Sequence, residues 1–565
     1  MSIIPPIGKF ASDIINQKYA HTKPSGNKES WDEIADRVVD SVINEDNGIF
    51  LTDLLRKYKE ICRRLIKERK FIPGGRYLYA AGRKYHPINN CFLFRAHDSR
   101  EGWGDLSRRC VNALMSGGGI GVDYSPVREE GAVVGGLGGY CTGPIALMNI
   151  QNENGRWIKQ GGSRRSAIWA ALRWAHRDIF KFITQKNWPD WLAQKKREDF
   201  NVPAPMDMTN ISVGLDDGFF AAYYNTSDRL HATARDVYWQ TVGQMLRTAE
   251  PGFSIDCGVN SGETLRNACT ELTSRDDNDV CNLGSLVLPR FASLDDFEEA
   301  VYAAVLFLVC GSVYSHLPFP EIAPVLEKNR RIGLGLMGFH EWCLRRDRRY
   351  GPDLELSRWL AVYAKSTYFA HEVEDVMGVS RSVKTRAVAP NGTIAIAAET
   401  TSSIEPIFAV ALLRRYLDGQ TWKAQYIVES AAKRLIDEGC DPDLIEDAHD
   451  LAEDVERRVS FQAWVQEYVD HAISSTINLP AWGSSVNNED TVRPFGEMLL
   501  KYLPRLRGIT VYPDGCRGGQ PLNRVPYREA VKHLGKTYTM NGEHFTAEVQ
   551  EYTNEVSCPG GVCGV

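Results

Sequence analysis

A short segment of the chain places an amide, a thiol and a carboxylate at alternating positions. Asn267, Cys269 and Glu271 belong to the stretch RNACTEL, residues 266–272. On a β-strand, the two-residue period turns these side chains to one face. If that face lines a cavity, it offers one substrate a sulfur centre, a general base and a hydrogen-bonding amide. The alternative is a surface strand in which the cysteine is a small buried apolar residue.

Other cysteines lie in segments that suit thiol chemistry. Cys91 belongs to NNCFLF, Cys281 to VCNLGSL, and the chain ends in CPGGVC with Cys558 and Cys563. The start, MSIIPPIGKF, has no secretion signal, so we expect the 13 cysteines to be reduced thiols rather than a disulfide framework. No second cysteine pair has zinc-ligand spacing, and we therefore predict a thiol relay at the C-terminus and no metal site.

Three glycine-containing segments raise the question of phosphate binding. In APNGT, residues 389–393, a helix-forming run follows, so backbone N–H groups and the Thr393 hydroxyl could hold an anion, or Thr393 could simply cap the helix. The string GLGLMG at 333–338 follows EKNRR rather than a buried strand, which argues against a dinucleotide fold. The GKT at 535–537 lacks the first glycine of a P-loop.

The elements that must position these residues indicate a mixed α/β body. Apolar residues between Trp31 and Lys70 recur at helical spacing. From about Phe71, short apolar runs broken by glycines alternate with helix-like segments such as 290–314 and 424–437.

We expect three regions. An N-terminal helical region covers residues 1–70, a catalytic α/β barrel covers 71–536, and a flexible tail with the last cysteine pair covers 537–565. No repeat or linker divides the central region into independent domains.

Composition excludes several classes of protein. The 565 residues are 43% hydrophobic and 24% charged, which is typical of a folded globular chain. The net charge of −6 provides no basic field for direct nucleic-acid binding. The most apolar run, residues 300–313, is shorter than the ~20 residues that cross a bilayer, so we interpret it as a buried helix. We expect a cytoplasmic protein with no membrane segment.

Seven motifs of the chain resemble those of one enzyme family. NACTEL, VCNLGSL, NNCF, KNRRIGLGLMGF, APNGTIAIAAETTSSIEP, TVYPDGCRGG and CPGGVC resemble the catalytic chain of the ribonucleotide reductases, from about Phe71 to the C-terminus. The resemblance implies a ten-stranded α/β barrel. It also implies an oxidoreductase that converts ribonucleotides to 2′-deoxyribonucleotides for DNA synthesis.

The resemblance assigns roles to the cysteines. It implies that Cys269 is the thiyl-radical residue that abstracts the 3′-hydrogen of the substrate ribose. Glu271 resembles the base for the 3′-hydroxyl proton, and Asn267 the amide that binds the sugar hydroxyls. Cys91 and Cys281 match the pair that supplies two electrons and becomes a disulfide when the 2′-hydroxyl leaves as water. A closed barrel would shield such a radical.

The resemblance also implies two binding sites. The segment PGGR at 73–76 resembles the family's substrate entrance, although Arg76 itself could be a surface ion-pair residue. The substrate-binding residues that we expect are Gly75, Asn90, Pro390, Asn391, Gly392 and Thr393. Residues 117–123 and 159–166 correspond to regions that bind a deoxynucleoside triphosphate effector, although the first could be a plain strand-to-helix turn. From them we select Asp123, Lys159, Arg164 and Arg165.

The radical source is the remaining question. Class I chains carry two adjacent tyrosines, whereas here Pro513 follows Tyr512, the one candidate for a radical relay. This departure favours class II, in which adenosylcobalamin bound to the same chain makes the radical. The large cobalamin-binding insertion of monomeric class II enzymes is missing, which favours a compact homodimer. The alternative is a class I subunit that needs a separate radical-generating subunit with its own metal cofactor. The N-terminal helical segment is short and lacks the motifs of the family's ATP-binding activity module, so we expect no on/off switch of that type.

The terminal cysteines imply one further partner. Cys558 and Cys563 match the family's C-terminal shuttle, which reduces the internal disulfide and is regenerated by thioredoxin or glutaredoxin. Two other classes remain as alternatives. A thioredoxin-type dithiol oxidoreductase could use CPGGVC but would place its thiols at a helix start. A reductase-derived nucleotide-binding regulator without catalysis could dispense with Cys269, which is present.

Overall fold

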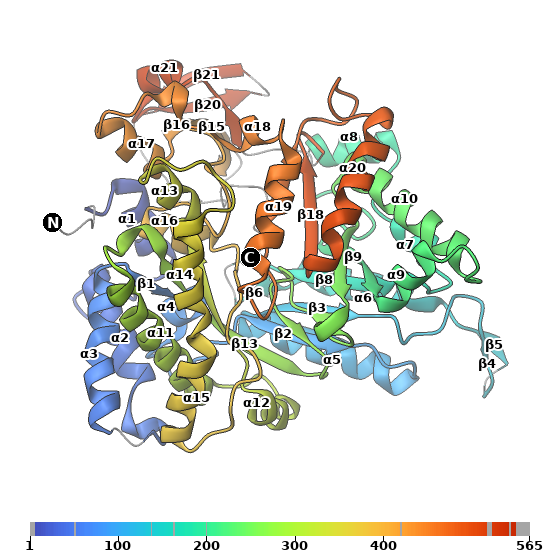
Figure 1. The fold of residues 1–565 in the computed structure, drawn as a ribbon, viewed down its shortest axis with the longest axis horizontal. Helices are drawn as coiled ribbons and strands as arrows, with labels where there is room; N and C mark the ends of the chain where they lie inside the picture. The colour runs from blue at the N-terminus through green and yellow to red at the C-terminus, as the bar shows by residue number, and fades with distance from the viewer. Residues whose placement is uncertain are drawn as a thin grey trace.

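A ten-stranded sheet forms the centre of the protein in the computed structural model, which describes residues 6–49, 52–136, 138–161, 164–198, 201–418, 421–516, 522–541 and 544–549 (Figure 1). The strands of this sheet are β1 (Phe71–Pro73), β2 (Cys91–Arg95), β3 (Gly119–Asp123), β8 (Ile168–Arg173), β9 (Thr209–Asp216), β10 (Gly252–Asp256), β13 (Asp279–Val287), β14 (Ile332–Met337), β17 (Thr476–Leu479) and β18 (Gly508–Pro513).

The sheet consists of two parallel halves that meet in antiparallel pairs. Strands β2, β3, β8, β9 and β10 are parallel neighbours in that order. In the other half, β13 is parallel to β14 and β17 is parallel to β18. Antiparallel pairing of β13 with β2 and of β10 with β18 joins the halves.

Two short extended segments close the ring. Leu334 of β14 forms a parallel bridge with Arg386, and Val388 forms one with Ile473, just before β17. Backbone hydrogen bonds from Ala387 N to the Leu334 carbonyl and from Val388 N to the Ala472 carbonyl continue this pairing. The structure therefore confirms the predicted ten-stranded barrel. GLGLMG is the barrel strand β14 and the turn after it, not a dinucleotide loop.

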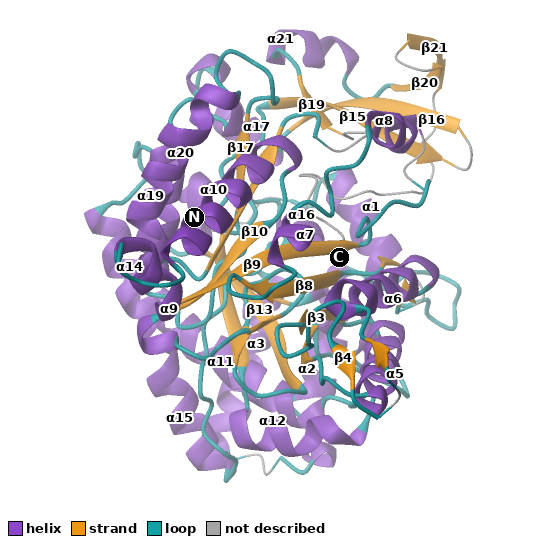
Figure 2. Ribbon diagram, turned by 90° about the vertical axis from the view of Figure 1, so that its right-hand side faces the viewer, coloured by secondary structure: helices purple, strands orange, loops and turns teal. Residues whose placement is uncertain are grey.

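Helices cover the outside of the barrel, as Figure 2 shows. α5 packs on β2 and β3, α6 on β8, α10 on β18, and α19 on β17. The helices are α1 (Lys9–Lys18), α2 (Trp31–Val42), α3 (Asp53–Lys67), α4 (Gly75–Ala80), α5 (Arg100–Ser116), α6 (Gly143–Trp157), α7 (Ile179–Ile183), α8 (Asp190–Glu198), α9 (Asp217–Tyr224), α10 (His231–Thr248), α11 (Leu294–Tyr314), α12 (Ala323–Asn329), α13 (Phe339–Leu344), α14 (Leu354–Ala364), α15 (Ser366–Met377), α16 (Gly392–Ala398), α17 (Ser430–Asp437), α18 (Ala448–Leu451), α19 (Val455–Gln466), α20 (Glu489–Tyr502) and α21 (Tyr527–Ala530).

The apolar segment found in the sequence is the core helix α11. It packs on β13, β14, α3, α14 and α15. Among the described residues it is the one helix long and apolar enough to cross a membrane, and 83% of its most apolar stretch is buried inside the protein. Burial on all sides explains why it is hydrophobic all round.

The N-terminal helices share one hydrophobic core with the barrel. α2 begins with a capping box in which Ser30 accepts from Glu33 N and the Glu33 carboxylate accepts from Ser30 N. Its buried side chains join a cluster that also contains residues of α3, α11, β14 and α16. These blue helices lie beside α11 and α15 in Figure 1. The helical region of residues 1–70 is therefore a layer of the same body.

A second sheet, absent from the sequence prediction, lies outside the barrel at the top of Figure 1. Its strands are β15 (Ala411–Asp418), β16 (Thr421–Val428), β19 (Leu522–Arg524), β20 (Thr537–Asn541) and β21 (His544–Val549). The expected helix at 424–437 is wrong in its first half because residues 421–428 pair with β15 and β20. The tail boundary at 537 is also wrong, because β20 and β21 continue this sheet.

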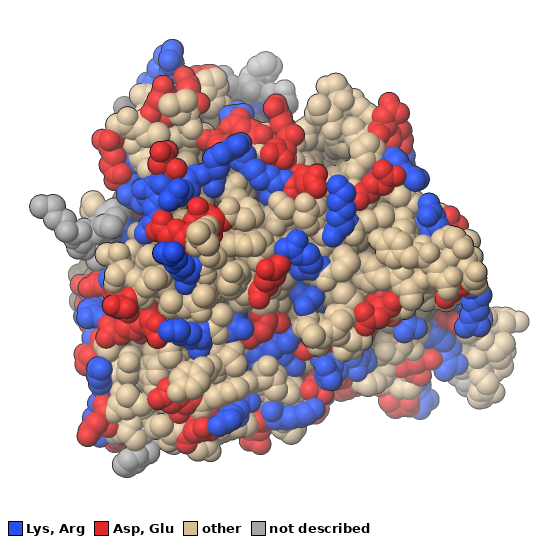
Figure 3. Space-filling model, in the orientation of Figure 1, with Lys and Arg blue, Asp and Glu red and all other residues tan. Residues whose placement is uncertain are grey.

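Charged side chains of both signs are interspersed on the face in Figure 3. No extended basic surface is visible on that face, in agreement with the net charge of −6.

Candidate active site

A hairpin inside the barrel carries the residues that the sequence singled out. β11 (Leu265–Arg266) pairs antiparallel with β12 (Thr273–Ser274), and residues 267–272 form the tip. Thr270 has a φ of 68°, which breaks the extended backbone. Residues 267–271 are therefore a loop and do not alternate as on a strand, yet Asn267, Cys269 and Glu271 line one cavity. We call residues 265–274 the finger.

Buried polar groups hold the base of the finger. Lys384 Nζ contacts the Glu263 carboxylate and donates to Thr273 Oγ1 at 3.0 Å, and Thr273 Oγ1 donates to Glu263 Oε2 at 2.8 Å. On β12, Ser274 Oγ donates to Asp279 Oδ2 at 2.6 Å. Because these groups are paired and all but the half-buried Lys384 are buried, they fix where the finger leaves the barrel wall.

Glycines on β3 let the finger approach the wall closely. A Cβ at Gly121 would lie 1.9 Å from the carbonyl oxygen of Arg266, and one at Gly119 would lie 2.9 Å from the Ala268 Cβ. The glycines that the sequence suggested for effector binding therefore serve here to seat the finger.

The tip of the finger faces a cavity of about 90 Å³. All six predicted substrate-binding residues line it together with four of the predicted catalytic ones. Its wall consists of Gly74, Gly75, Asn90, Cys91, Gly119, Asn267, Ala268, Cys269, Glu271, Leu283, Gly284, Ala389, Pro390, Asn391, Gly392, Thr393 and Ile394. We call it the Cys269 cavity.

Within this cavity, Cys91 links the amide and the carboxylate. Asn267 Nδ2 donates to Cys91 Sγ at 2.9 Å, and Cys91 Sγ lies 3.8 Å from Glu271 Oε1. Asn267 Oδ1 accepts from Leu272 N at 3.0 Å, which fixes the amide. Burial raises the pKa of Glu271 to about 7. A carboxyl group with this pKa can accept and return a proton near neutral pH.

The cysteines of the site are thiols rather than thiolates. Burial, and then the nearby Glu271 carboxyl, raises the pKa of Cys269 well above its ordinary value. Burial likewise raises the pKa of Cys91 and of Cys281. A nucleophilic cysteine needs a lowered pKa. The site therefore favours chemistry of the S–H group over nucleophilic attack.

Cys91 and Cys281 lie directly opposite each other on two neighbouring strands. They are direct register partners in the antiparallel pair of β2 and β13. Direct partners in such a pair have Cα atoms about 4.5–5.5 Å apart, within the ~7 Å limit for a disulfide. Both are free thiols in this structure. They are therefore placed to exchange two electrons as a dithiol and a disulfide.

Several polar atoms of the cavity wall have no hydrogen-bond partner in the described structure. These are Asn90 Oδ1, Glu271 Oε2 and Asn391 Nδ2, all buried. Buried polar atoms are nearly always paired, so unpaired ones in a cavity wall indicate a polar ligand. Ser285 Oγ donates to Asn391 Oδ1 at 3.0 Å, which leaves the amide nitrogen of Asn391 for that ligand.

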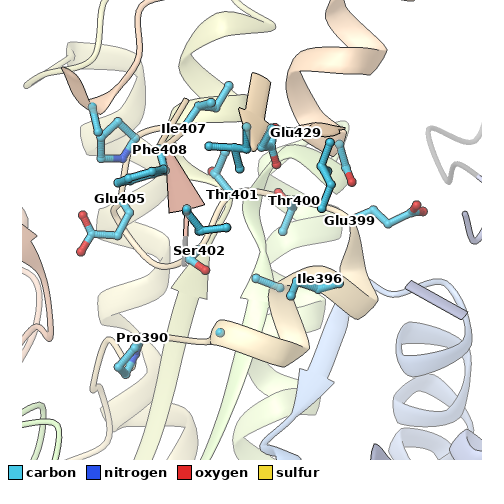
Figure 4. Close-up of a pocket in the computed structure, with 18 of the residues that line it drawn as sticks. Pro390, Ile396, Glu399, Thr400, Thr401, Ser402, Glu405, Ile407, Phe408 and Glu429 are labelled. Atoms are coloured by element: carbon cyan, nitrogen blue, oxygen red, sulfur yellow. The ribbon is translucent and has the colours of Figure 1, made fainter. Parts of the chain in front are cut away.

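The helix predicted after APNGT is α16, and it separates two cavities. Pro390 and Gly392 line both the Cys269 cavity and a second cavity of about 190 Å³. Figure 4 shows Ile396 on this helix and Thr400, Thr401 and Ser402 on the segment that follows it, around the second cavity. Most of its lining is apolar, and the buried Thr401 Oγ1 has no partner among the described residues.

The predicted effector residues fall into two separate places. Lys159 and Arg165 belong to a hairpin of β6 (Lys159–Gln160) and β7 (Arg164–Arg165) at the N-terminal end of β3. There, Gln160 Nε2 donates to the Gly117 carbonyl at 3.1 Å. Asp123 is at the opposite end of β3, where its Oδ2 accepts from Thr264 Oγ1 at 2.7 Å. Asp123 therefore supports the base of the finger and does not join the other residues.

The other residues singled out in the sequence are not among the described residues that line the Cys269 cavity. Tyr512 lies on β18 opposite Asn478, outside the lining of the Cys269 cavity. Arg76 donates to the carbonyls of Pro87 and Ser116. Cys558 and Cys563 lie outside the described residues.

Sequence reasoning missed several residues that line the two cavities or contact their lining. Ser285 and Thr401 stand inside quoted motifs, VCNLGSL and TTSSIEP, but their contacts depend on strands and loops far away in sequence. Tyr19 has no local signal at all, and its hydroxyl lies 2.5 Å from Thr393 Oγ1.

Known proteins share this architecture and these motifs. A vitamin B12-dependent ribonucleoside-diphosphate reductase of Thermoplasma acidophilum is 26% identical over 586 residues, which cover 92% of this chain and 72% of that protein. One of Mycobacterium tuberculosis is 25% identical over 583 residues, 91% of this chain and 80% of that protein. A crystal structure of a B12-dependent class II ribonucleotide reductase superposes with a TM-score of 0.70 at 16% identity, covering 94% of this chain and 95% of that one, and so shares the fold.

The two B12-dependent relatives favour the class II interpretation over the class I alternative. Residues 89–236, 223–373 and 371–512 match the barrel domain of ribonucleotide reductase. With the closed barrel, the finger and the paired cysteines in place, this match confirms that the chain belongs to the ribonucleotide reductase family.

Proposed function

We propose that this chain reduces ribonucleotides to 2′-deoxyribonucleotides by radical chemistry at Cys269, with adenosylcobalamin as the radical source. The observation that carries the proposal is the Cys269 cavity, where a thiol of raised pKa and a carboxyl group of pKa about 7 meet Cys91, the direct cross-strand partner of Cys281. The names of the B12-dependent relatives support the choice of cofactor.

Cys269 removes and later returns one hydrogen atom. As a sulfur radical it takes the 3′-hydrogen of the ribose, and at the end of the cycle its S–H gives a hydrogen back. Glu271 accepts the proton of the 3′-hydroxyl, which favours loss of the neighbouring 2′-hydroxyl as water. Asn267 donates its amide hydrogens within the same wall. The position of this cavity inside the barrel would limit the contact of the radical with solvent.

Cys91 and Cys281 supply the two electrons. The ribonucleotide and two thiols yield a deoxyribonucleotide, one disulfide and one water, so two hydrogens leave the sulfurs and the S–S bond forms. Direct cross-strand pairing permits this bond without rearrangement of the strands. Cys558 and Cys563 would then reduce the disulfide, with thioredoxin or glutaredoxin as the external reductant.

The second cavity fits the adenosyl part of the cofactor. Its apolar lining suits a purine ring, and the unpaired Thr401 hydroxyl and nearby carboxylates suit ribose hydroxyls. Ile396, Thr401 and Phe408 would hold that group beside the Cys269 cavity. When bound, adenosylcobalamin supplies a single oxidising equivalent in radical form. The chain's own part is to shape the cavity and to present the Cys269 thiol.

The substrate would bind between the finger and α16. Gly75 and Asn90 form one wall, and Asn391 and Thr393 offer donors for the phosphates on the other. A deoxynucleoside triphosphate effector would bind at the hairpin of residues 159–165, whose Lys159 side chain is exposed. Asp123 is left out of this proposal.

Further partners follow from the surface. Met115, Ile150 and Trp157 on the packed helices α5 and α6 are 64%, 46% and 81% exposed. Such an apolar surface supports a homodimer through these helices. We place the enzyme in the cytoplasm and expect no direct contact with nucleic acid.

The decisive experiment is an assay of the purified chain alone. Ribonucleotide reduction is measured with thioredoxin and effector, with and without adenosylcobalamin. Activity that requires the cofactor supports the proposal. If the chain is inactive with adenosylcobalamin but becomes active when a radical-generating subunit is added, the class I alternative is correct.

Two variants test the assigned roles. Cys269→Ser should abolish product formation but leave nucleotide binding intact, because a hydroxyl cannot serve as the sulfur radical. Cys558→Ser should block turnover with thioredoxin but permit turnover with a small dithiol that enters the barrel. Substantial activity of Cys269→Ser would refute the proposal.

A further inference from the structure

The N-terminal helix α1 supports α16, whose first residues line the Cys269 cavity. The two helices pack together, and residues flanking α1 are bonded to the two ends of α16. Gly8 N donates to Glu399 Oε1 at 3.0 Å at the C-terminal end, and the Tyr19 hydroxyl lies 2.5 Å from Thr393 Oγ1 at the N-terminal end. The two helices therefore run antiparallel.

We propose that Tyr19 is a positioning residue for the substrate. Its hydroxyl donates to Thr393 Oγ1 and so directs the Thr393 hydroxyl hydrogen into the Cys269 cavity, toward the anionic phosphate of a ribonucleotide. The inference rests on the proposed function, because it takes the ligand of this cavity to be a ribonucleotide.

The direction of this hydrogen bond follows from the two hydroxyl groups. Each has one hydrogen to donate, so only one of them donates in the pair. A phenol is more acidic than an aliphatic alcohol, so the tyrosine hydroxyl is the better donor. Donation by Tyr19 leaves the Thr393 hydrogen for the cavity, whereas donation by Thr393 would present only lone pairs to an anion. Two consecutive hydrogen bonds that end on a charged acceptor also strengthen each other.

The environment makes this bond hard to replace. Tyr19 is 1% exposed, so water does not compete for its hydroxyl. A phenylalanine in its place would fill nearly the same volume but leave Thr393 Oγ1 without the donor. The Thr393 hydroxyl hydrogen could then rotate away from the ligand.

The neighbouring donor of the cavity wall is arranged in the same way. Ser285 Oγ donates to Asn391 Oδ1, and Asn391 Nδ2 remains without a partner among the described residues although the side chain is only 9% exposed. In both pairs, a buried hydroxyl donates to the oxygen of the neighbouring side chain. That side chain therefore keeps a hydrogen that it can donate into the cavity. This second, independent pair points to an acceptor-rich ligand at this wall.

The test compares binding of a ribonucleoside diphosphate with binding of the matching nucleoside. Calorimetry uses the full chain and the variants Tyr19→Phe and, as a control, Tyr58→Phe, whose ring packs on Tyr302 of α11 and does not line the Cys269 cavity. We expect Tyr19→Phe to raise the dissociation constant of the diphosphate roughly fivefold, the effect of about one hydrogen bond. The nucleoside should bind equally to all three proteins. In turnover, KM should rise with kcat changed less.

A double-mutant cycle with Thr393→Val separates the inference from the proposed function. In the Thr393→Val background, Tyr19→Phe should have no further effect on diphosphate binding, because the group that it orients is gone. Unchanged diphosphate binding by Thr393→Val would show that the phosphate site of the proposed function is wrong. Weaker binding by Thr393→Val with unchanged binding by Tyr19→Phe would overturn the inference alone. Equal weakening of diphosphate and nucleoside by Tyr19→Phe would also overturn it, because that pattern indicates a purely structural role.

Discussion

Substitution of Gly121 by alanine tests how the finger is held. Gly121 lies on β3, and a Cβ there would be 1.9 Å from the Arg266 carbonyl oxygen and 2.8 Å from its carbonyl carbon. Ordinary contacts between such atoms are about 3.5 Å, so the finger would have to move by roughly 1.5 Å. Both contacted atoms belong to the backbone and cannot rotate away.

The expected cost follows from that displacement. Overpacking of this kind lowers the free energy of unfolding by about 1–3 kcal/mol. Cys269 stands three residues beyond Arg266, and a misplacement of about 1 Å at a reacting group can reduce turnover by roughly 100-fold. We therefore expect Gly121→Ala to be less stable and nearly inactive.

The assay combines denaturant unfolding with ribonucleotide reduction. Gly104→Ala is the matched control, because Gly104 lies inside α5 and a Cβ there meets nothing within 4 Å. Alanine should stabilise this helix by about 0.5–1 kcal/mol and leave turnover unchanged. Wild-type stability and turnover in Gly121→Ala would refute the close seating of the finger on β3. Lower stability with full turnover would show that this contact does not set the position of Cys269.

Four further outcomes can be measured. Burial raises the pKa of Glu271 from 4.5 to about 7, so its contribution to stability is fully present below pH 4.5 and is lost as the pH rises from 4.5 through 7. The melting temperature of Glu271→Gln should therefore exceed that of the wild type increasingly from pH 4.5 to 7 and by a constant amount above pH 7, and a difference that stays constant from pH 4.5 to 7 would contradict the assignment. Turnover of the wild type should rise across pH 6–8 as Glu271 ionises, and Glu271→Gln should lose that rise. Mild oxidation of the folded chain should join Cys91 to Cys281, as peptide mapping would detect, and failure to find that disulfide would contradict their pairing. Trp157→Glu should convert a dimer to a monomer in light scattering, whereas an unchanged mass would exclude the surface of α5 and α6 as the interface.

The local sequence was sufficient to predict the chemistry of single side chains and the position of helices. The residue types at Cys269 and Glu271 indicated a thiol beside a base, and the run after Asn391 predicted the helix α16. The uniformly apolar run at 300–313 predicted the buried helix α11. Such patterns work because a side chain brings its chemistry with it, and a helix makes its hydrogen bonds within a few residues.

Tertiary structure decided the pairings. Residues 424–428 form a strand because their partners in β15 and β20 outweigh local helical preference. The finger is a hairpin because Thr270 turns the chain and the buried network at Glu263 and Lys384 holds its base. Tyr19 meets Thr393 across 374 positions. Contacts of this kind depend on the packing of the whole barrel, and no spacing within a single segment encodes them.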